Sequence, residues 1–254
     1  MEEFQRDKVF LYYQQLLSTT ALTSPVTVVE KSRRTGYSWA AAAVAVFVSS
    51  PAENAQNTYY MGYDYEMARE FIQYVGEWAK KIGEACSEAE EYIFKDPDNP
   101  DKDIKAFRVT FANGKEALPS VARALRGKQG FVIIDEAAFH DDLKEVLKAA
   151  FALLIWGGQV LIISTHNGED NPFNDLIKDI RAGKSPYKLL RCTFDDALRQ
   201  GLYKRICQKQ GKEEPGSRRP MESRHLQILR RQRGGRAGLY SGQRIRKLFQ
   251  PLNR

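Results

Sequence analysis

The chain has 254 residues, of which 43% are hydrophobic, enough for one substantial α/β domain with residues to spare. No run of about 18 apolar residues occurs, so no transmembrane helix is predicted. The polar, acidic first residues do not resemble a secretory signal, and we expect a cytoplasmic protein without a membrane role. The three cysteines and three histidines are scattered, which argues against a disulfide framework or a zinc site. Mg²⁺ bound by oxygen atoms stays possible.

The net charge of +7 is unevenly distributed along the chain. Residues 212–254 contain 12 Lys/Arg and 3 Asp/Glu, a charge of +9, so residues 1–211 carry 7 − 9 = −2. A basic surface on a folded domain is the electrostatic sign of nucleic-acid binding. The body of the chain therefore offers no bulk-charge argument for binding DNA.

Between residues 26 and 194, strand-like and helix-like patches alternate. Apolar or β-branched runs predict strands at residues 26–29, 57–62, 104–111, 131–134, 159–164 and 189–194, and apolar spacing predicts helices at residues 39–48, 64–90 and 143–156. We expect Asp64 to cap the second helix and the Asp/Pro-rich residues 95–102 to form an exposed loop. Trp39, Trp78 and Trp156 are expected in the core. The alternation predicts an α/β fold with a mostly parallel sheet and helices on both faces.

The composition changes after about residue 210. Residues 218–248 are rich in Arg and Gly and show no sustained helix or strand period. We therefore predict two parts: a folded domain at residues 1–211 and a basic, disordered tail at residues 212–254.

A first candidate site lies where the predicted strand at residues 26–29 leads through a loop containing Gly36 to a hydroxyl residue, Ser38, at a helix start. Backbone N–H groups and the positive helix end can bind phosphates there, and Ser38 can reach Mg²⁺. The G-x-x-x-x-G-K-[ST] pattern is half met, because only one glycine is present and Tyr37 stands in the place of the lysine. A simple basic turn is the alternative.

A second candidate is the acidic pair Asp135–Glu136 at the end of the predicted buried strand at residues 131–134. In an ATPase Asp135 would hold Mg²⁺, directly or through water, and Glu136 would polarise the attacking water. A strand that ends in a solvated acidic turn is the alternative.

A third candidate is the end of the strand at residues 159–164, where Ser164 and Thr165 are followed by His166 and Asn167. Such groups can form hydrogen bonds with the γ-phosphate or the water and so couple hydrolysis to the next element. Taken alone, the segment is better explained as an ordinary transition from a strand to a loop. Because the carboxyl ends of parallel strands share one edge of a sheet, all three segments are expected to converge.

Four strings together make a specific resemblance: EKSRRTGYSW at residues 30–39, LPS with LRG at 118–127, IIDEAAFH at 133–140 and STHNG at 164–168. They resemble the large terminase subunit of Mu-like phages and prophages over about residues 8–211. The resemblance implies the P-loop NTPase fold of the RecA/ASCE-like class, and an ATPase that acts as the motor for DNA packaging.

The resemblance also implies site residues. The lysine of the phosphate loop is displaced to Lys31, and Arg33 or Arg34 adds charge on the γ-phosphate. ATP is held by Lys31, Ser32, Arg33, Arg34, Thr35, Gly36, Tyr37 and Ser38. Mg²⁺ is held by Ser38 and Asp135. Glu136 is the catalytic base, and Ser164–Thr165 is the coupling motif.

Implied partners are double-stranded DNA, the portal protein, the small terminase subunit and further copies of the chain in a ring. Family members continue into an RNase H-like nuclease, for which we see no carboxylate set here, so nuclease activity is not expected. Codons for the tail can be chosen so that a shift of the reading frame by one nucleotide encodes a different peptide. That peptide has mixed charge and resembles the family's link to the nuclease. We therefore predict that residues from about 213 onward are out of frame. A helicase-type ATPase and a catalytically silent prophage remnant are the alternative functions.

Two minor features complete the sequence predictions. Gln14 or Gln15 can contact adenine, as a glutamine upstream of the phosphate loop does in related motors, although a solvated helix face is the favoured reading. His140 and His166 flank the motifs without ligand spacing and are expected to be satisfied loop histidines.

Overall fold

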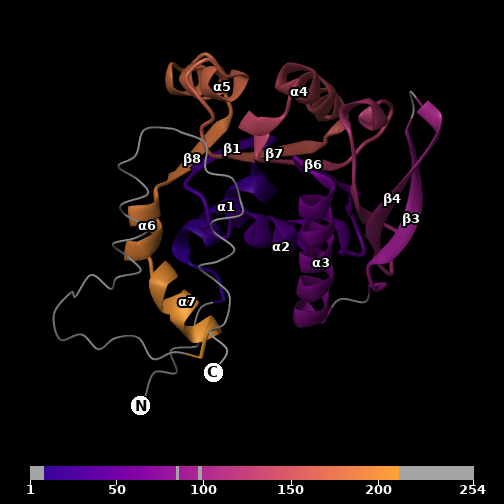
Figure 1. The fold of residues 1–254 in the computed structure, drawn as a ribbon, viewed down its shortest axis with the longest axis horizontal. Helices are drawn as coiled ribbons and strands as arrows, with labels where there is room; N and C mark the ends of the chain where they lie inside the picture. Colours follow the sequence, from indigo (N-terminus) through magenta and orange to yellow (C-terminus); the bar gives the residue numbers. More distant parts are fainter. Residues whose placement is uncertain (1–8, 84–85, 97–98, 212–254) are drawn as a thin grey trace. The chain divides into compact units, whose positions relative to one another are not determined.

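The computed structural model describes residues 9–83, 86–96 and 99–211. The chain divides into two compact units at Ile206/Cys207. The described part of the first unit contains one eight-stranded sheet in the order β3-β4-β5-β2-β6-β7-β1-β8 (Figure 1). The strands are β1 (Val26–Lys31), β2 (Thr58–Met61), β3 (Glu90–Asp96), β4 (Asn99–Thr110), β5 (Glu116–Pro119), β6 (Phe131–Asp135), β7 (Gln159–Ser164) and β8 (Lys188–Cys192).

The sheet is mostly parallel. All neighbouring pairs from β5 to β8 are parallel, while β3–β4 and β4–β5 are antiparallel. Strand β7 lies between β1 and β6, with Glu30 opposite Ser164 and Asp135 opposite Ile163. The ends of these three strands therefore meet at one edge of the sheet, as the sequence predicts.

Helices cover both faces, which confirms the predicted fold class. Figure 1 shows α1, α2 and α3 on one side of the sheet and α4 and α5 on the other. The helices are α1 (Tyr12–Thr23), α2 (Tyr37–Ser49), α3 (Tyr65–Ile82), α4 (Leu143–Ala152), α5 (Pro172–Arg181), α6 (Phe194–Arg199) and α7 (Leu202–Lys209), with short 3₁₀ turns η1 (Ala122–Leu125), η2 (Ala137–Phe139) and η3 (Leu153–Trp156).

Two apolar cores hold the layers together. Strand β6 contributes to both, because its side chains alternate between the faces. Phe131 and Ile133 pack in the core with α1–α3, and Val132 and Ile134 pack in the core with α4 and α5. All four side chains are fully buried, and each such burial is worth about 1.5–3 kcal/mol. The continuous apolar run is thus the result of a strand covered on both faces.

Several predicted boundaries differ from the structure. The predicted helix at residues 64–90 is capped by Asp64, whose carboxylate accepts a hydrogen bond from Met67 N at 2.8 Å. It ends earlier, at Ile82, because Gly83 adopts a left-handed conformation (φ 80°) that stops the helix. At the predicted strand 189–194, β8 ends at Cys192, since Thr193 instead caps α6.

The prediction of a loop at residues 95–102 is wrong for residues 95–96 and 99–102, while residues 97 and 98 lie outside the described part of the chain. Strands β3 and β4 pair there as an antiparallel hairpin, and backbone pairing continues to Lys95 opposite Asp103. The register then jumps to Asp96 opposite Asn99, so residues 100–102 fall in the irregularity. Proline is tolerated at such a bulge, where the ladder needs no N–H donor.

The prediction for Trp156 is also wrong. Trp78 is buried and Trp39 packs beside it, with 4.4 Å between ring centroids. Trp156 is 73% exposed and is the last residue of η3, before Gly157 in a left-handed conformation (φ 79°).

The predicted tail, including the hypothesis that it is out of frame, lies outside the described residues. Within the described part of the chain, no helix has the length and apolarity needed to cross a bilayer.

Candidate functional site: the carboxyl edge of β1, β6 and β7

The loop between β1 and α2 has the backbone of a phosphate-binding turn. Arg34 and Gly36 both adopt left-handed conformations, with φ of 61° and 75°. The Thr35 hydroxyl donates to Ser32 O at 3.0 Å and closes the turn. The Ser32 hydroxyl accepts from Phe194 N at 3.0 Å, which ties the loop to the start of α6. Successive backbone N–H groups in such a turn form an anion-binding concavity at the N-terminus of a helix.

Helix α1 supports the same loop. The Tyr13 hydroxyl donates to Thr35 O at 2.6 Å, and Gln14 Nε2 donates to Gly36 O at 3.1 Å. Gln14 is 5% exposed. The prediction that it lies on a solvated helix face is therefore wrong. Its amide is held instead between the loop and the start of α1, where Gln14 Oε1 accepts from Leu11 N at 3.0 Å.

Gly36 is expected to tolerate no side chain. A Cβ there would lie 3.0 Å from Gln14 Nε2, and the positive φ disfavours any L-residue. Gly36→Ala should therefore lower the free energy of unfolding by about 1–3 kcal/mol, measured by urea denaturation. The matched control is Gly114→Ala, where φ is also positive but nothing lies within 4 Å. Equal losses in both variants would show that the backbone conformation alone matters, without the contact to Gln14.

Tyr37, at the position where the usual pattern has its lysine, lies in the core. Its side chain is 2% exposed and packs against Tyr13, with 5.3 Å between ring centroids. Burial, with the neighbouring Cys192, raises the pKa of Tyr37 far above its ordinary value. Tyr37 is thus a neutral core residue at the first position of α2.

Lys31, the last residue of β1, instead provides the buried cation of the site. Its ammonium lies 2.7 Å from Glu136 Oε1, and the two side chains are 6% and 23% exposed. Glu136 follows β6 in a left-handed conformation with φ of 49°. Its second oxygen, Oε2, is buried with no hydrogen-bond partner among the described residues.

Asp135 meets Ser38 at the start of α2. The Ser38 hydroxyl donates to Asp135 Oδ2 at 2.5 Å, and the Tyr60 hydroxyl at the end of β2 donates to the same oxygen at 3.2 Å. Burial raises the pKa of Asp135, and nearby Lys31 opposes that shift. A fully buried carboxylate beside a hydroxyl favours a hard cation, so this pair of oxygens fits Mg²⁺. Tyr60 carries no motif signal and escapes sequence reasoning.

The turn after Glu136 is held by the loop that follows β7. The Ser164 hydroxyl accepts from Ala138 N at 3.0 Å and donates to Thr165 O at 2.7 Å. The hydroxyl oxygen of Thr165 is buried without a partner among the described residues. His140 Nε2 contacts Asp135 O at 3.1 Å, as expected for a satisfied histidine.

The two arginines of the loop are exposed and have different surroundings. The Arg33 guanidinium lies over the Phe139 ring, 5.6 Å from its centroid, and so lies against the turn that carries Glu136. Arg34 lies near Tyr74 on α3. Burial raises the pKa of Tyr74, and the charge of Arg34 opposes part of that rise. The loop thus presents one arginine to η2 and the other to α3.

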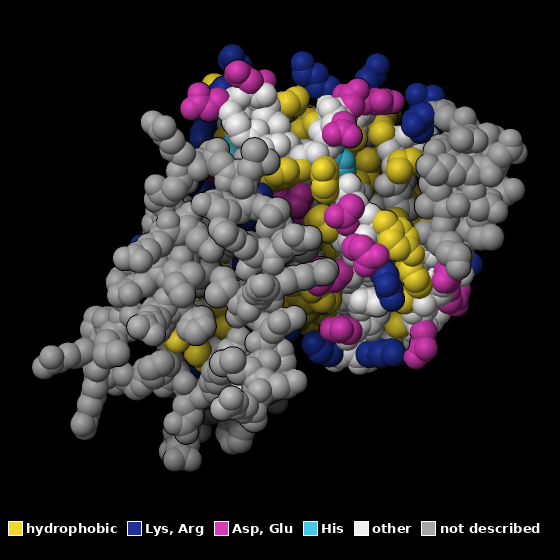
Figure 2. Space-filling view, viewed as in Figure 1, with side chains coloured by type: hydrophobic (Ala, Val, Ile, Leu, Met, Phe, Trp, Pro, Cys, Tyr) yellow, Lys and Arg dark blue, Asp and Glu magenta, His cyan; other side chains and the backbone are white. Residues whose placement is uncertain are grey.

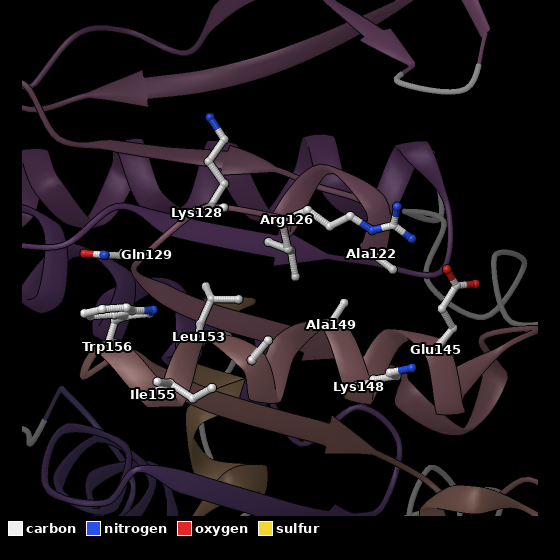
Figure 3. A pocket seen from close by; sticks show the side chains of 13 residues that line it. Ala122, Arg126, Lys128, Gln129, Glu145, Lys148, Ala149, Leu153, Ile155 and Trp156 are labelled. Atoms are coloured by element: carbon white, nitrogen blue, oxygen red, sulfur yellow. The ribbon is translucent and has the colours of Figure 1, made fainter.

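A separate cavity of about 520 Å³ lies between the segment around η1 and helix α4 with η3. Figure 3 shows Trp156 beside Gln129 at one end and Glu145 with Arg126 toward the other. No residue of the predicted site lines it. On the face drawn in Figure 2, acidic and basic side chains of the described residues are interspersed, in keeping with the weak bulk charge of the body.

Comparison with known proteins finds two similar sequences. It is 48% identical over 209 residues to the Mu-like prophage FluMu protein gp28 of Haemophilus influenzae, covering 81% of this chain. It is 43% identical over 209 residues to the "Probable terminase, large subunit gp28" of Escherichia phage Mu, covering 80% of this chain. The chain is thus similar, over about four fifths of its length, to part of a terminase large subunit of a Mu-like phage. It spans 40% and 37% of the length of these two relatives. No family model matches it.

Solved terminase structures share the fold. The large terminase of a thermophilic bacteriophage, solved in complex with ADP, superposes with a TM-score of 0.55 at 18% identity, over 78% of this chain and 49% of that one. The large terminase ATPase domain of a Thermus phage gives a TM-score of 0.50 at 18% identity, over 78% of this chain and 87% of that one. The described α/β unit therefore has the fold of a terminase ATPase domain.

Proposed function

We propose that this chain binds ATP with Mg²⁺ at the β1–α2 loop and hydrolyses it as the motor domain of a DNA-packaging terminase. The observation that carries the proposal is the meeting of two pairs, Lys31 with Glu136 and Ser38 with Asp135, at one edge of the sheet. Lys31 supplies a cation for the phosphates, and Glu136 supplies a base. Ser38 and Asp135 supply oxygen ligands for a metal ion. The family of the relatives supports DNA packaging as the work that hydrolysis drives.

The triphosphate would lie in the turn formed by residues 32–36, at the N-terminus of α2. Backbone N–H groups and the helix dipole favour the negative phosphates there. Lys31 would bind the β- and γ-phosphates from the end of β1. The left-handed Arg34 and Gly36 support this placement, since they give the turn its concave backbone.

Binding would also prepare the base. The Lys31 ammonium lies 2.7 Å from Glu136 Oε1 and neutralises its charge. Phosphate oxygens would compete with Glu136 for the Lys31 ammonium. Once the ammonium binds the phosphates, Glu136 would be free to accept a proton from the attacking water. The buried, unpartnered Oε2 supports this role, because it already faces no competing donor among the described residues.

Ser38 and Asp135 would hold Mg²⁺, which neutralises phosphate charge when bound. The Ser38 hydroxyl donates directly to the Asp135 carboxylate at 2.5 Å. Tyr60 is a third group at the same carboxylate, and its hydrogen bond would help to fix the carboxylate orientation.

Of the two arginines, we assign the contact with the γ-phosphate to Arg33. Its position over Phe139 places it beside the turn of Glu136, whereas Arg34 lies near α3. Arg33→Ala should lower kcat by about 10- to 100-fold, the effect of removing one charge-stabilising donor. Arg34→Ala should change kcat by about threefold or less. Steady-state phosphate release measures both, and a larger loss in the Arg34 variant would reverse the assignment.

Ser164 and Thr165 would couple hydrolysis to movement. Ser164 already bonds the turn after Glu136, and the unpartnered Thr165 hydroxyl can respond to a ligand. Double-stranded DNA, the portal protein, the small terminase subunit and further copies of the chain in a ring are the partners we propose for the whole motor, in the host cytoplasm.

Phosphate release from ATP by the purified chain tests the proposal. Turnover should require Mg²⁺ and stop on addition of EDTA. A preparation of Glu136→Gln made in the same way controls for contaminating ATPases. Hydrolysis that is equal in both preparations, or no nucleotide binding at all, would contradict the proposal.

A further inference from the structure

Glu30, the residue before Lys31, lies at the centre of a charged cluster that the hydrolysis site does not explain. Its Oε1 lies 2.8 Å from His166 Nε2, and its Oε2 lies 2.5 Å from Arg181 Nη2 and 3.7 Å from Arg191 Nε. These partners come from the loop after β7, the end of α5 and strand β8. The Glu30 side chain is only 13% exposed. One carboxylate thus joins three elements to β1.

His166 continues this connection into α5. Its Nδ1 contacts Asn174 Oδ1, and its ring centroid lies 5.9 Å from that of Phe173. The Asn174 amide donates back to the loop, to Gly168 O at 2.5 Å and to Glu169 O at 3.1 Å. Both ring nitrogens of His166 therefore face oxygen atoms, and the loop at residues 165–171 is fixed at its start and in its middle.

The same loop holds the turn of the proposed base. Asn167 Nδ2 and Asn171 Nδ2 donate to Ala138 O at 3.2 and 2.9 Å, and Ser164 binds Ala138 N. Both polar groups of the Ala138 backbone are thus bound by residues of one segment. Because Ala138 lies two residues after Glu136, a displacement of the loop would move the turn that carries Glu136.

Successive side chains of a strand point to opposite faces, so Lys31 engages Glu136 while Glu30 engages His166. We infer that Glu30 is a positioning residue, which acts through His166 and the loop at residues 165–171 to set the place of Glu136 relative to Lys31. This inference rests on the proposed ATP hydrolysis, because its effect is on the geometry of the base. A loosened loop would leave nucleotide binding intact and misplace the base, and small misplacements can cost about 100-fold in rate.

The expected effect of Glu30→Gln is therefore a fall in kcat of about 10- to 100-fold, with the Kd for ATP changed by about twofold or less. His166→Ala should cause a similar fall. Because both act through one contact, the double variant should be no slower than the slower single variant. Lys178→Ala is the matched control, an exposed cation on α5 that pairs with neighbouring Asp175, and its kcat should equal that of the wild type.

If the fall in kcat of the double variant equalled the product of the two single falls, the inference would be overturned. An unchanged kcat in Glu30→Gln would also overturn it. A parallel rise in Kd and loss of Tm would assign Glu30 a merely structural role and would overturn it too. Amide hydrogen exchange of the wild type and Glu30→Gln separates this inference from the proposed function. We expect faster exchange at residues 136–140 as well as at residues 165–171, whether or not the chain hydrolyses ATP. Unchanged exchange at residues 136–140 would refute the connection even in an active enzyme.

Discussion

Glu136→Gln is expected to lower the kcat for ATP hydrolysis by about 10²- to 10⁴-fold, the usual contribution of a positioned base. The amide keeps the size of the side chain but accepts no proton from water. Nucleotide should still bind, and more tightly by roughly 5- to 30-fold (about 1–2 kcal/mol), because ATP no longer competes with a charged partner for Lys31. Phosphate release gives kcat, and titration with a fluorescent ATP analogue gives the Kd.

Glu145→Gln is the control for this experiment, since it changes an exposed carboxylate on α4 outside the site. It should leave both kcat and Kd at the wild-type values. If Glu136→Gln instead lost nucleotide binding, Glu136 would have a structural role and the assignment of the base would be wrong.

The second large effect is expected for Lys31→Ala, which should raise the Kd for ATP by about 10- to 150-fold. The loss corresponds to about 1.5–3 kcal/mol for a hydrogen bond to a charged group. Lys31→Arg, which keeps the charge, should recover part of the affinity. Calorimetric titration with ATP and with adenosine measures the effect, and only the binding of the phosphate-bearing ligand should weaken.

Tyr37→Phe is the counterpart, because Tyr37 occupies the position at which the usual pattern has its lysine. With its ring in the core, the variant should bind ATP within about twofold of the wild type. It should lose only about 1 kcal/mol of stability, from the deleted buried hydroxyl. The opposite outcome, weak binding in Tyr37→Phe and normal binding in Lys31→Ala, would refute a displaced lysine.

Local patterns explain why much of the fold could be predicted. The buried runs of β1, β6 and β7 and the alanine-rich α2 have compositions that only covered elements tolerate. Their order along the chain then brings the three strand ends to one edge. The acidic pair and the hydroxyl residues follow these strands directly, so their convergence follows from topology alone.

What escaped prediction depends on contacts between residues far apart in sequence. Glu30 and His166 are 136 positions apart, and each alone looks like an ordinary polar residue. Gln14 looks like a surface residue, because its contact with Gly36 depends on how α1 packs. The hairpin of β3 and β4 was missed for a different reason, since backbone pairing can override a turn-like composition.

Helix α2 has a consequence for how the molecule can move. Its residues from Ala40 to Val46 are fully buried on every side, and close-packed interiors hardly yield to compression. We therefore expect this stretch behind the β1–α2 loop to be rigid, with amides that exchange only on global unfolding. A chemical event at its N-terminus would then leave the helix in place. The resulting displacement would appear instead in the loop after β7, where residues 166–170 are exposed, and α2 would be the fixed frame against which the movement of the proposed motor is measured.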